Sequence, residues 1–149
     1  MKHIKVGLLS TFLALSVSAN PFEGVTEKDS KCFARTYTKQ ELAAHKLQTV
    51  KQMTVKLGRR MDLNIIDVRV LRTNNKRYKA ALACNDEGSC WIDCDGGSAT
   101  LKLAGNALQF TNNGFIMQGG CGEDEKEIIF LESKPGGDDV FLLSPSRCK

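Results

Sequence analysis

Six cysteines are the side chains with the clearest chemistry in this 149-residue chain. An even number of cysteines in a small exported chain is typical of structural disulfides, so we expect three bridges. A zinc site would need close cysteine pairs that repeat or combine with histidines, and a redox site would need two residues between its cysteines. Neither pattern occurs. The six are Cys32, Cys84, Cys90, Cys94, Cys121 and Cys148.

Spacing favours one pairing of these cysteines without fixing it. A bridge between Cys32 and Cys148 would tie the two ends of the domain together. Cys84 and Cys90 flank a five-residue turn and are placed to face each other across a hairpin. Cys94 and Cys121 then remain, each near paired glycines that let backbones approach closely. The rival pairing joins Cys84 to Cys94 and Cys90 to Cys121, and six cysteines allow 15 connectivities in all.

The first nineteen residues have the pattern of a secretory signal. Met1–Lys5 is cationic, Val6–Val17 is mostly apolar, and small residues follow at Ser18 and Ala19. The apolar run is shorter than the roughly 20 residues that span a bilayer. We therefore predict cleavage after Ala19 and a periplasmic or secreted location, with no transmembrane segment in the rest of the chain.

The charges are distributed unevenly along the sequence. Residues 31–79 carry 13 basic and 3 acidic side chains, whereas residues 80–149 carry 5 basic and 11 acidic ones. Two interpretations are open: the halves of one domain attract each other, or a basic face binds an anionic partner such as an acidic protein or an envelope polymer. Nucleic acid is not expected outside the cytoplasm, and aromatic residues at 7% are too few for a stacking platform. The candidate binding face comprises Arg59, Arg60, Arg69, Arg72, Lys76 and Arg77.

No catalytic, metal or cofactor residue is assigned from the sequence. His45 is the one histidine after the signal, and it lies within a predicted helix. Most carboxylates fall in predicted turns, where solvated acids are usual. Asp93–Ser98 has some of the oxygen ligands of a calcium loop but lacks the further acidic ligand. We therefore expect a non-enzymatic protein.

Periodicity predicts a β-rich fold. Residues 20–30 are polar and are expected to form a flexible leader. Thr38 and Glu41 have the spacing of a capping box, which predicts a helix of two to three turns. Alternating apolar residues then predict eight or nine strands, separated by turns that include one at Asn112–Gly114. We expect a single domain over residues 31–149, built as an antiparallel eight-stranded barrel or sandwich with one short N-terminal helix and tied by disulfides.

Parts of the chain resemble a set of small exported bacterial proteins to which no activity is assigned. The resemblance rests on Cys32–Tyr37, Leu42–His45 and Gln48–Val50, and on Cys90–Gly97 with Gly119–Gly122. The expected architecture is also similar to periplasmic inhibitors of c-type lysozyme, although the chain lacks their Ser-Gly-x-x-Tyr segment. We expect an exported binding module for a protein or an envelope polymer. The alternatives are a lipocalin-like binder of small ligands and a lysozyme-inhibitor-like protein.

Overall fold

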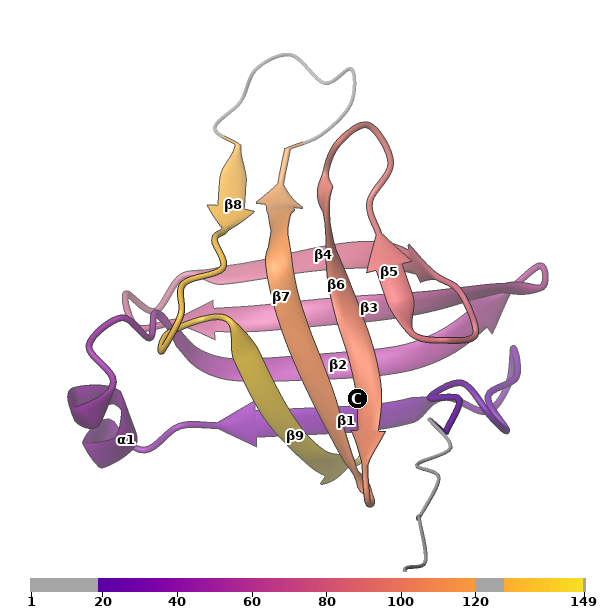
Figure 1. Ribbon diagram of the computed structural model, residues 1–149, viewed down its shortest axis with the longest axis horizontal. Helices are drawn as coiled ribbons and strands as arrows, with labels where there is room; N and C mark the ends of the chain where they lie inside the picture. Colours follow the sequence, from indigo (N-terminus) through magenta and orange to yellow (C-terminus); the bar gives the residue numbers. More distant parts are fainter. Residues whose placement is uncertain (1–18, 120–127, 149) are drawn as a thin grey trace, which may run out of the picture.

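Residues 19–119 and 128–148 are described by a computed structural model, in which they form one antiparallel sheet closed into a barrel. The elements in chain order are β1 (Lys31–Thr36), α1 (Lys39–Ala44), β2 (Val50–Arg60), β3 (Leu63–Arg72), β4 (Arg77–Cys84), β5 (Ser89–Trp91), β6 (Gly97–Ala104), β7 (Ala107–Gln118), β8 (Ile129–Leu131) and β9 (Val140–Ser146). Figure 1 shows β1 to β4 running across the direction of β6, β7 and β9.

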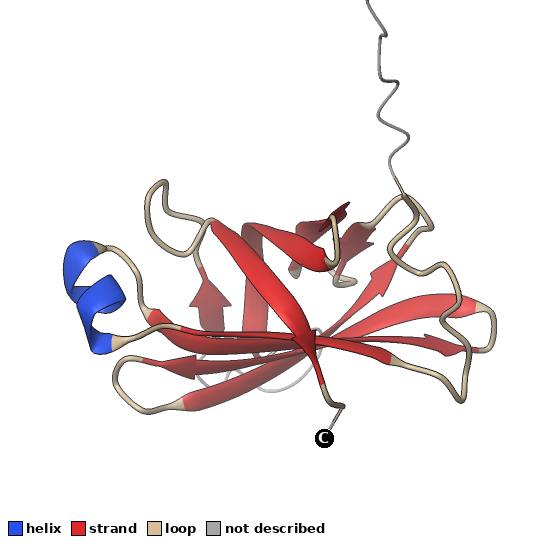
Figure 2. Ribbon diagram, turned by 90° about the horizontal axis from the view of Figure 1, so that it is seen from below, coloured by secondary structure: helices blue, strands red, loops and turns tan. Residues whose placement is uncertain are grey.

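Eight strands close the barrel. Each strand from β1 to β7 pairs with the next along the chain, and β9 joins β7 to β1. The short strand β8 is additional: it pairs with Phe115–Gln118 of β7, whereas β9 pairs with Leu108–Thr111. The predicted mainly-β antiparallel barrel is therefore confirmed. Strands dominate the described chain, and α1 lies at one end of the β1–β4 layer (Figure 2).

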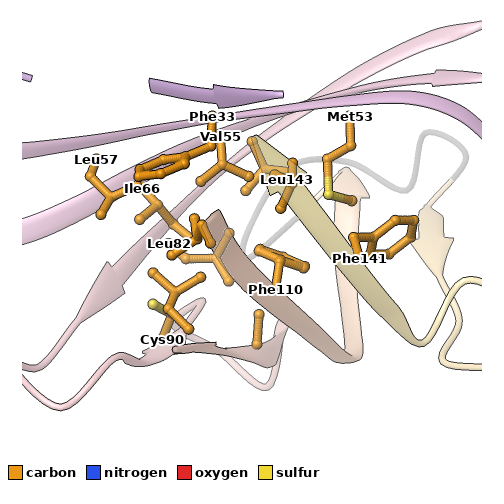
Figure 3. Close-up of a cluster of buried hydrophobic side chains, with 14 of the residues drawn as sticks. Phe33, Met53, Val55, Leu57, Ile66, Leu82, Cys90, Phe110, Phe141 and Leu143 are labelled. Atoms are coloured by element: carbon orange, nitrogen blue, oxygen red, sulfur yellow. The ribbon is translucent and has the colours of Figure 1, made fainter. Parts of the chain in front are cut away.

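The barrel interior is filled by the apolar side chains that alternate along the strands. In β2, Met53, Val55 and Leu57 are buried, as their period-2 spacing predicted. Burying a side chain of this size contributes about 1.5–3 kcal/mol. Figure 3 shows side chains from both layers meeting in the centre. The interior set includes Phe33, Met53, Val55, Leu57, Ile66, Val68, Val70, Leu82, Leu101, Leu108, Phe110, Phe115, Phe141 and Leu143.

Strand β7 crosses the position where the sequence predicted a turn. Asn112–Gly114 lies inside one strand that bends, because Gly114 has a φ of +90°. The buried Asn112 side chain makes hydrogen bonds within the fold. Its amide nitrogen donates to the backbone oxygens of Leu131 and Asp138, at 3.3 and 2.7 Å. Its oxygen accepts from the Gly114 N–H at 2.8 Å. An amide that is fully hydrogen-bonded is tolerated in a core.

The first part of the domain also differs from expectation. Residues 20–30 do not form a loose leader, because Phe22 and Val25 are 2% and 3% exposed and belong to the core. Strand β1 was not predicted, since only Phe33 in it is fully buried. The capping box at Thr38 and Glu41 is present, but the helix has six residues instead of two to three turns.

Two of the expected disulfides are present. Cys32 is bridged to Cys148 and Cys84 to Cys90, which excludes the rival pairing. Cys94 is also disulfide-bonded, while Cys121 lies outside the described residues, as do residues 1–18 of the predicted signal. Across residues 19–119 and 128–148, no helix is long and apolar enough to cross a membrane. The disulfides are consistent with an extracellular or periplasmic protein.

Candidate functional site: a cationic groove outside the barrel

The outer face of the β1–β4 layer is set by strand register. One row across the four strands contains Ala34, Thr54, Arg69 and Lys79, because each residue is directly opposite the next. Side chains directly opposite each other on one face of an antiparallel sheet have Cβ atoms about 4.5–5.5 Å apart. Small side chains thus occupy the β1 and β2 side of this row, and two cations occupy the β3 and β4 side.

A groove of about 1360 Å³ follows this face and continues past the edge of β4. Its opposite wall comes from the segment after β5 and from the end of β7, with Ile92, Gly96 and Ile116 among the lining residues. The groove therefore combines apolar lining residues with a smaller number of polar and charged ones, which is the usual composition of a binding site. Its charged described residues are Lys56, Asp67, Arg69, Arg77, Lys79, Asp93 and Arg147.

Arg69 and Lys79 form the centre of the positive charge in the groove. They are directly opposite on the same face, and like charges in this position are destabilising. Arg77 lies two residues from Lys79 on the same side of β4. Among residues 19–119 and 128–148, the ion pairs within 4.0 Å are Arg35–Glu41, Arg59–Asp86 and Lys134–Glu132. No groove cation takes part in these pairs.

The structure brings together two of the six residues of the predicted binding face. Arg69 and Arg77 line the groove. Arg60, the last residue of β2, and Lys76, in the turn before β4, are exposed and do not line it.

The other two predicted arginines have structural partners. Arg59 donates to the Asn64 side-chain oxygen at 3.1 Å and lies 3.9 Å from Asp86. Arg72 lies over the Tyr78 ring, 5.4 Å from its centroid, and donates to the Phe130 carbonyl at 2.8 Å. These arginines hold elements of the barrel together and do not extend the groove.

Sequence reasoning missed three groove cations: Lys56, Lys79 and Arg147. A signal for Lys79 is present in the sequence, where the turn residues Asn74–Lys76 separate two runs of alternating apolar residues. A turn centred on Asn74 places residue 79 opposite residue 69. Arg69 alternates with the buried Val68 and Val70, and Lys79 with the half-buried Tyr78 and Ala80. No local pattern places Arg147 in the groove, because its position depends on the pairing of β9 with β1.

In the described part of the chain, the β4 edge that borders the groove lacks a hydrogen-bonded neighbouring strand over most of its length. On one side β4 pairs with β3 at every residue from Arg77 to Cys84. On the other side β5 pairs only with Ala83 and Cys84. Figure 1 shows β5 at one end of β4. Within the described ranges, no strand is hydrogen-bonded to the groove side of Arg77–Ala81, although the end of β7 packs near β4 and lines the same groove.

A second polar cluster lies where β1 meets α1. Arg35 is 2.7 Å from the Glu41 carboxylate and 5.0 Å from the centroid of the Tyr37 ring. Hydrogen bonds from the Thr38 backbone and side chain hold the pKa of Glu41 below its usual value, and Arg35 lowers it further. Burial raises the pKa of Tyr37. Because Glu41 also caps α1, this cluster fixes the helix to the barrel.

Other chemistry is not assembled elsewhere in the described chain. His45 ends α1 and does not line the groove. Within residues 19–119 and 128–148, no three His, Cys, Asp or Glu side chains are grouped so that they could hold a metal ion. Comparisons with models of protein families, with curated proteins and with solved structures found no match for the chain.

Proposed function

We propose that this protein is an exported, non-enzymatic binding module that takes an anionic partner in the groove outside its barrel. Signal cleavage near Ala19 releases it into the periplasm or the medium, in agreement with its resemblance to small exported bacterial proteins. The observation that carries the proposal is the pair of directly opposed cations, Arg69 and Lys79, with Arg77 beside them. An anion that contacts all three relieves their mutual repulsion.

The shape of the site supports an extended partner. The groove passes over the outer faces of β2, β3 and β4, and its lining residues include both Cys32 of β1 and Ile116 of β7. Its positive side chains are distributed along its length, since Lys56 and Arg147 lie toward the β1 side and Arg77 on β4. A chain of several acidic groups matches this distribution better than a single small anion.

The alternative functions receive less support. The interior of the barrel is filled by buried side chains such as Phe110, Phe115 and Phe141. Their rings pack edge to face, with centroids 5.9 and 6.2 Å apart. A lipocalin-like ligand would need that space, so the outer groove is favoured as the binding site. No observation specifically favours a lysozyme-inhibitor-like activity.

Binding of poly-L-glutamate by the mature, oxidised protein tests the proposal. We expect measurable affinity in isothermal titration calorimetry that falls with added salt. The triple variant Arg69→Ser, Arg77→Ser, Lys79→Ser should bind about ten-fold more weakly or worse, since each exposed charge contact contributes about 0.2–1 kcal/mol.

A control variant separates the groove from net charge. Arg60→Ser, Lys76→Ser, Lys102→Ser removes the same number of positive charges at exposed positions that do not line the groove. We expect it to retain most of the wild-type affinity. Equal losses in the two triple variants, or no binding of the polyanion by the wild-type protein, would contradict the proposal.

A further inference from the structure

The part of β4 that pairs with no second strand among the described residues presents hydrogen-bonding groups as well as charge. Arg77–Ala81 spans about 17 Å at the usual rise of an antiparallel strand, and all five residues line the groove. Across residues 19–119 and 128–148, no strand pairs with these five residues on the side away from β3, where β5 pairs only with Ala83 and Cys84. An edge of this kind is a template for another strand.

The register shows which backbone groups are available. The Arg72 N–H donates to the Lys76 carbonyl at 2.9 Å, so this opposite pair is a hydrogen-bonded one. Hydrogen-bonded and non-hydrogen-bonded pairs alternate along antiparallel strands. The pairs Val70–Tyr78 and Val68–Ala80 therefore repeat the bonded type, and the pair Arg69–Lys79 is non-bonded. It follows that the N–H and C=O groups of Lys79, and likewise of Arg77 and Ala81, point away from β3.

The β4–β5 pairing gives the same assignment independently. The Asn85 N–H donates to the Ser89 carbonyl at 3.0 Å, which makes that pair hydrogen-bonded. Cys84 and Cys90 are then a non-bonded pair, in agreement with their Cα–Cα distance of 4.0 Å. Ala83 bonds to β5, and the same side of β4 continues through Ala81 and Lys79 without a partner strand in the described part of the chain.

We propose that the partner is an acidic protein segment that adds to the sheet as an extra strand along Arg77–Ala81 of β4. The inference rests on the proposed function and narrows it to a peptide. The N–H and C=O groups of Arg77, Lys79 and Ala81 that point away from β3 recognise an extended peptide backbone. Arg69, Arg77 and Lys79 recognise its acidic side chains. A polysaccharide or lipid headgroup matches the charge but does not supply the alternating amide donors and acceptors of a strand.

Cations on an exposed strand edge also have a protective role, because they discourage uncontrolled pairing between chains. That role is compatible with the proposal, since a cationic strand is repelled, a neutral strand gains no charge pairing and an acidic strand is attracted. Selective pairing with acidic segments is the difference between a protected edge and a binding edge.

Amide hydrogen exchange measured by NMR tests strand addition. The probe is a synthetic decapeptide in which Glu and Val alternate, added to the mature, oxidised protein. On binding, exchange at Arg77, Lys79 and Ala81 should slow by about ten-fold or more. The amides of Tyr78 and Ala80, which already bond to β3, should change little. Alternation of this kind along a single strand is the signature of backbone pairing.

Two N-methylated peptides supply the control. One carries the methyl groups on every Glu nitrogen and the other on every Val nitrogen, so each blocks a different edge of the peptide strand. We expect one of the two to lose binding by about ten-fold or more and the other to bind nearly as well as the parent.

The outcomes separate strand addition from the broader function. If acidic peptides bind at Arg69 and Lys79 without slowing the three amides, and both methylated peptides bind equally, strand addition is overturned while the cationic groove stands. If polyglutamate binds and the decapeptide does not, strand addition is again overturned. If neither probe binds, both proposals fail.

Discussion

Reversing the charge of Lys79 should stabilise the protein while it weakens binding. Lys79 is directly opposite Arg69 on the outer face, and no acidic side chain among the described residues lies within 4.0 Å of either cation. Two unit charges about 6 Å apart in water interact by about 0.7 kcal/mol. Lys79→Glu removes this repulsion and introduces an attraction of similar size. Because both side chains are exposed and can move apart, we expect a net gain of about 1 kcal/mol.

Urea denaturation of the oxidised protein measures this gain. The expected increase in the free energy of unfolding corresponds to a rise in Tm of about 3–4 °C for a domain of this size. The gain should shrink in about 0.5 M salt, since exposed charges are screened. The same variant should bind polyglutamate several-fold more weakly, so stability and binding change in opposite directions.

Lys102→Glu is the matched control for this substitution. Lys102 is exposed on β6 and is directly opposite the neutral Gln109, so the net charge changes equally without relief of a like-charge pair. We expect this variant to remain within about 0.5 kcal/mol of the wild type. The reasoning is refuted if Lys79→Glu destabilises the protein, or if both variants change its stability by the same amount.

Three further perturbations test the framework that positions the groove. Asp138 is 3% exposed, and its carboxylate accepts from the backbone N–H groups of Thr49 and Val50. Its replacement by Asn should cost about 1–3 kcal/mol, because the new amide donor would face these buried donors. A loss below about 1 kcal/mol in urea denaturation would contradict this. Replacing Cys32 and Cys148 by Ser removes a disulfide with a sequence separation of 116, which should lower the free energy of unfolding by up to about 4.9 kcal/mol. An unchanged midpoint of urea denaturation would contradict this entropic estimate. Glu41→Gln should lower Tm at pH 7 but not near pH 2. The folded-state pKa of Glu41 is depressed, so the stability that its carboxylate contributes is present above the unfolded-state pKa and disappears as the pH falls through the folded-state pKa. An equal change in Tm at both pH values would count against the capping role.

Local patterns predicted the parts of the fold that depend on neighbouring residues. Alternation identified the buried faces of β2, β3 and β4, and the five residues between Cys84 and Cys90 suggested their bridge. The same patterns misplaced a turn at Asn112–Gly114, because the side chain of Asn112 is satisfied by backbone oxygens from a segment about 20 residues further along the chain. Polar composition at residues 20–30 concealed Phe22 and Val25, whose burial depends on the closed barrel.

The candidate site was predictable only in part for a similar reason. Hairpin register alone places Arg69 opposite Lys79. The groove itself depends on β5 ending at Trp91, so that it pairs with β4 only at Ala83 and Cys84, and on β9 bringing Arg147 alongside β1. These are consequences of strand length and closure, which no short stretch of sequence specifies. Counting arginines between residues 59 and 77 therefore mixed groove cations with structural ones.

The most direct measurement of the central claim is a map of where an acidic probe contacts the protein. In a titration of ¹⁵N-labelled protein with poly-L-glutamate, we predict that the chemical-shift changes concentrate on the outward-facing residues of β2, β3 and β4, with Arg69 and Lys79 among the largest. Changes centred on β6 and β9, or spread evenly over all exposed lysines and arginines, would contradict a binding site in the cationic groove.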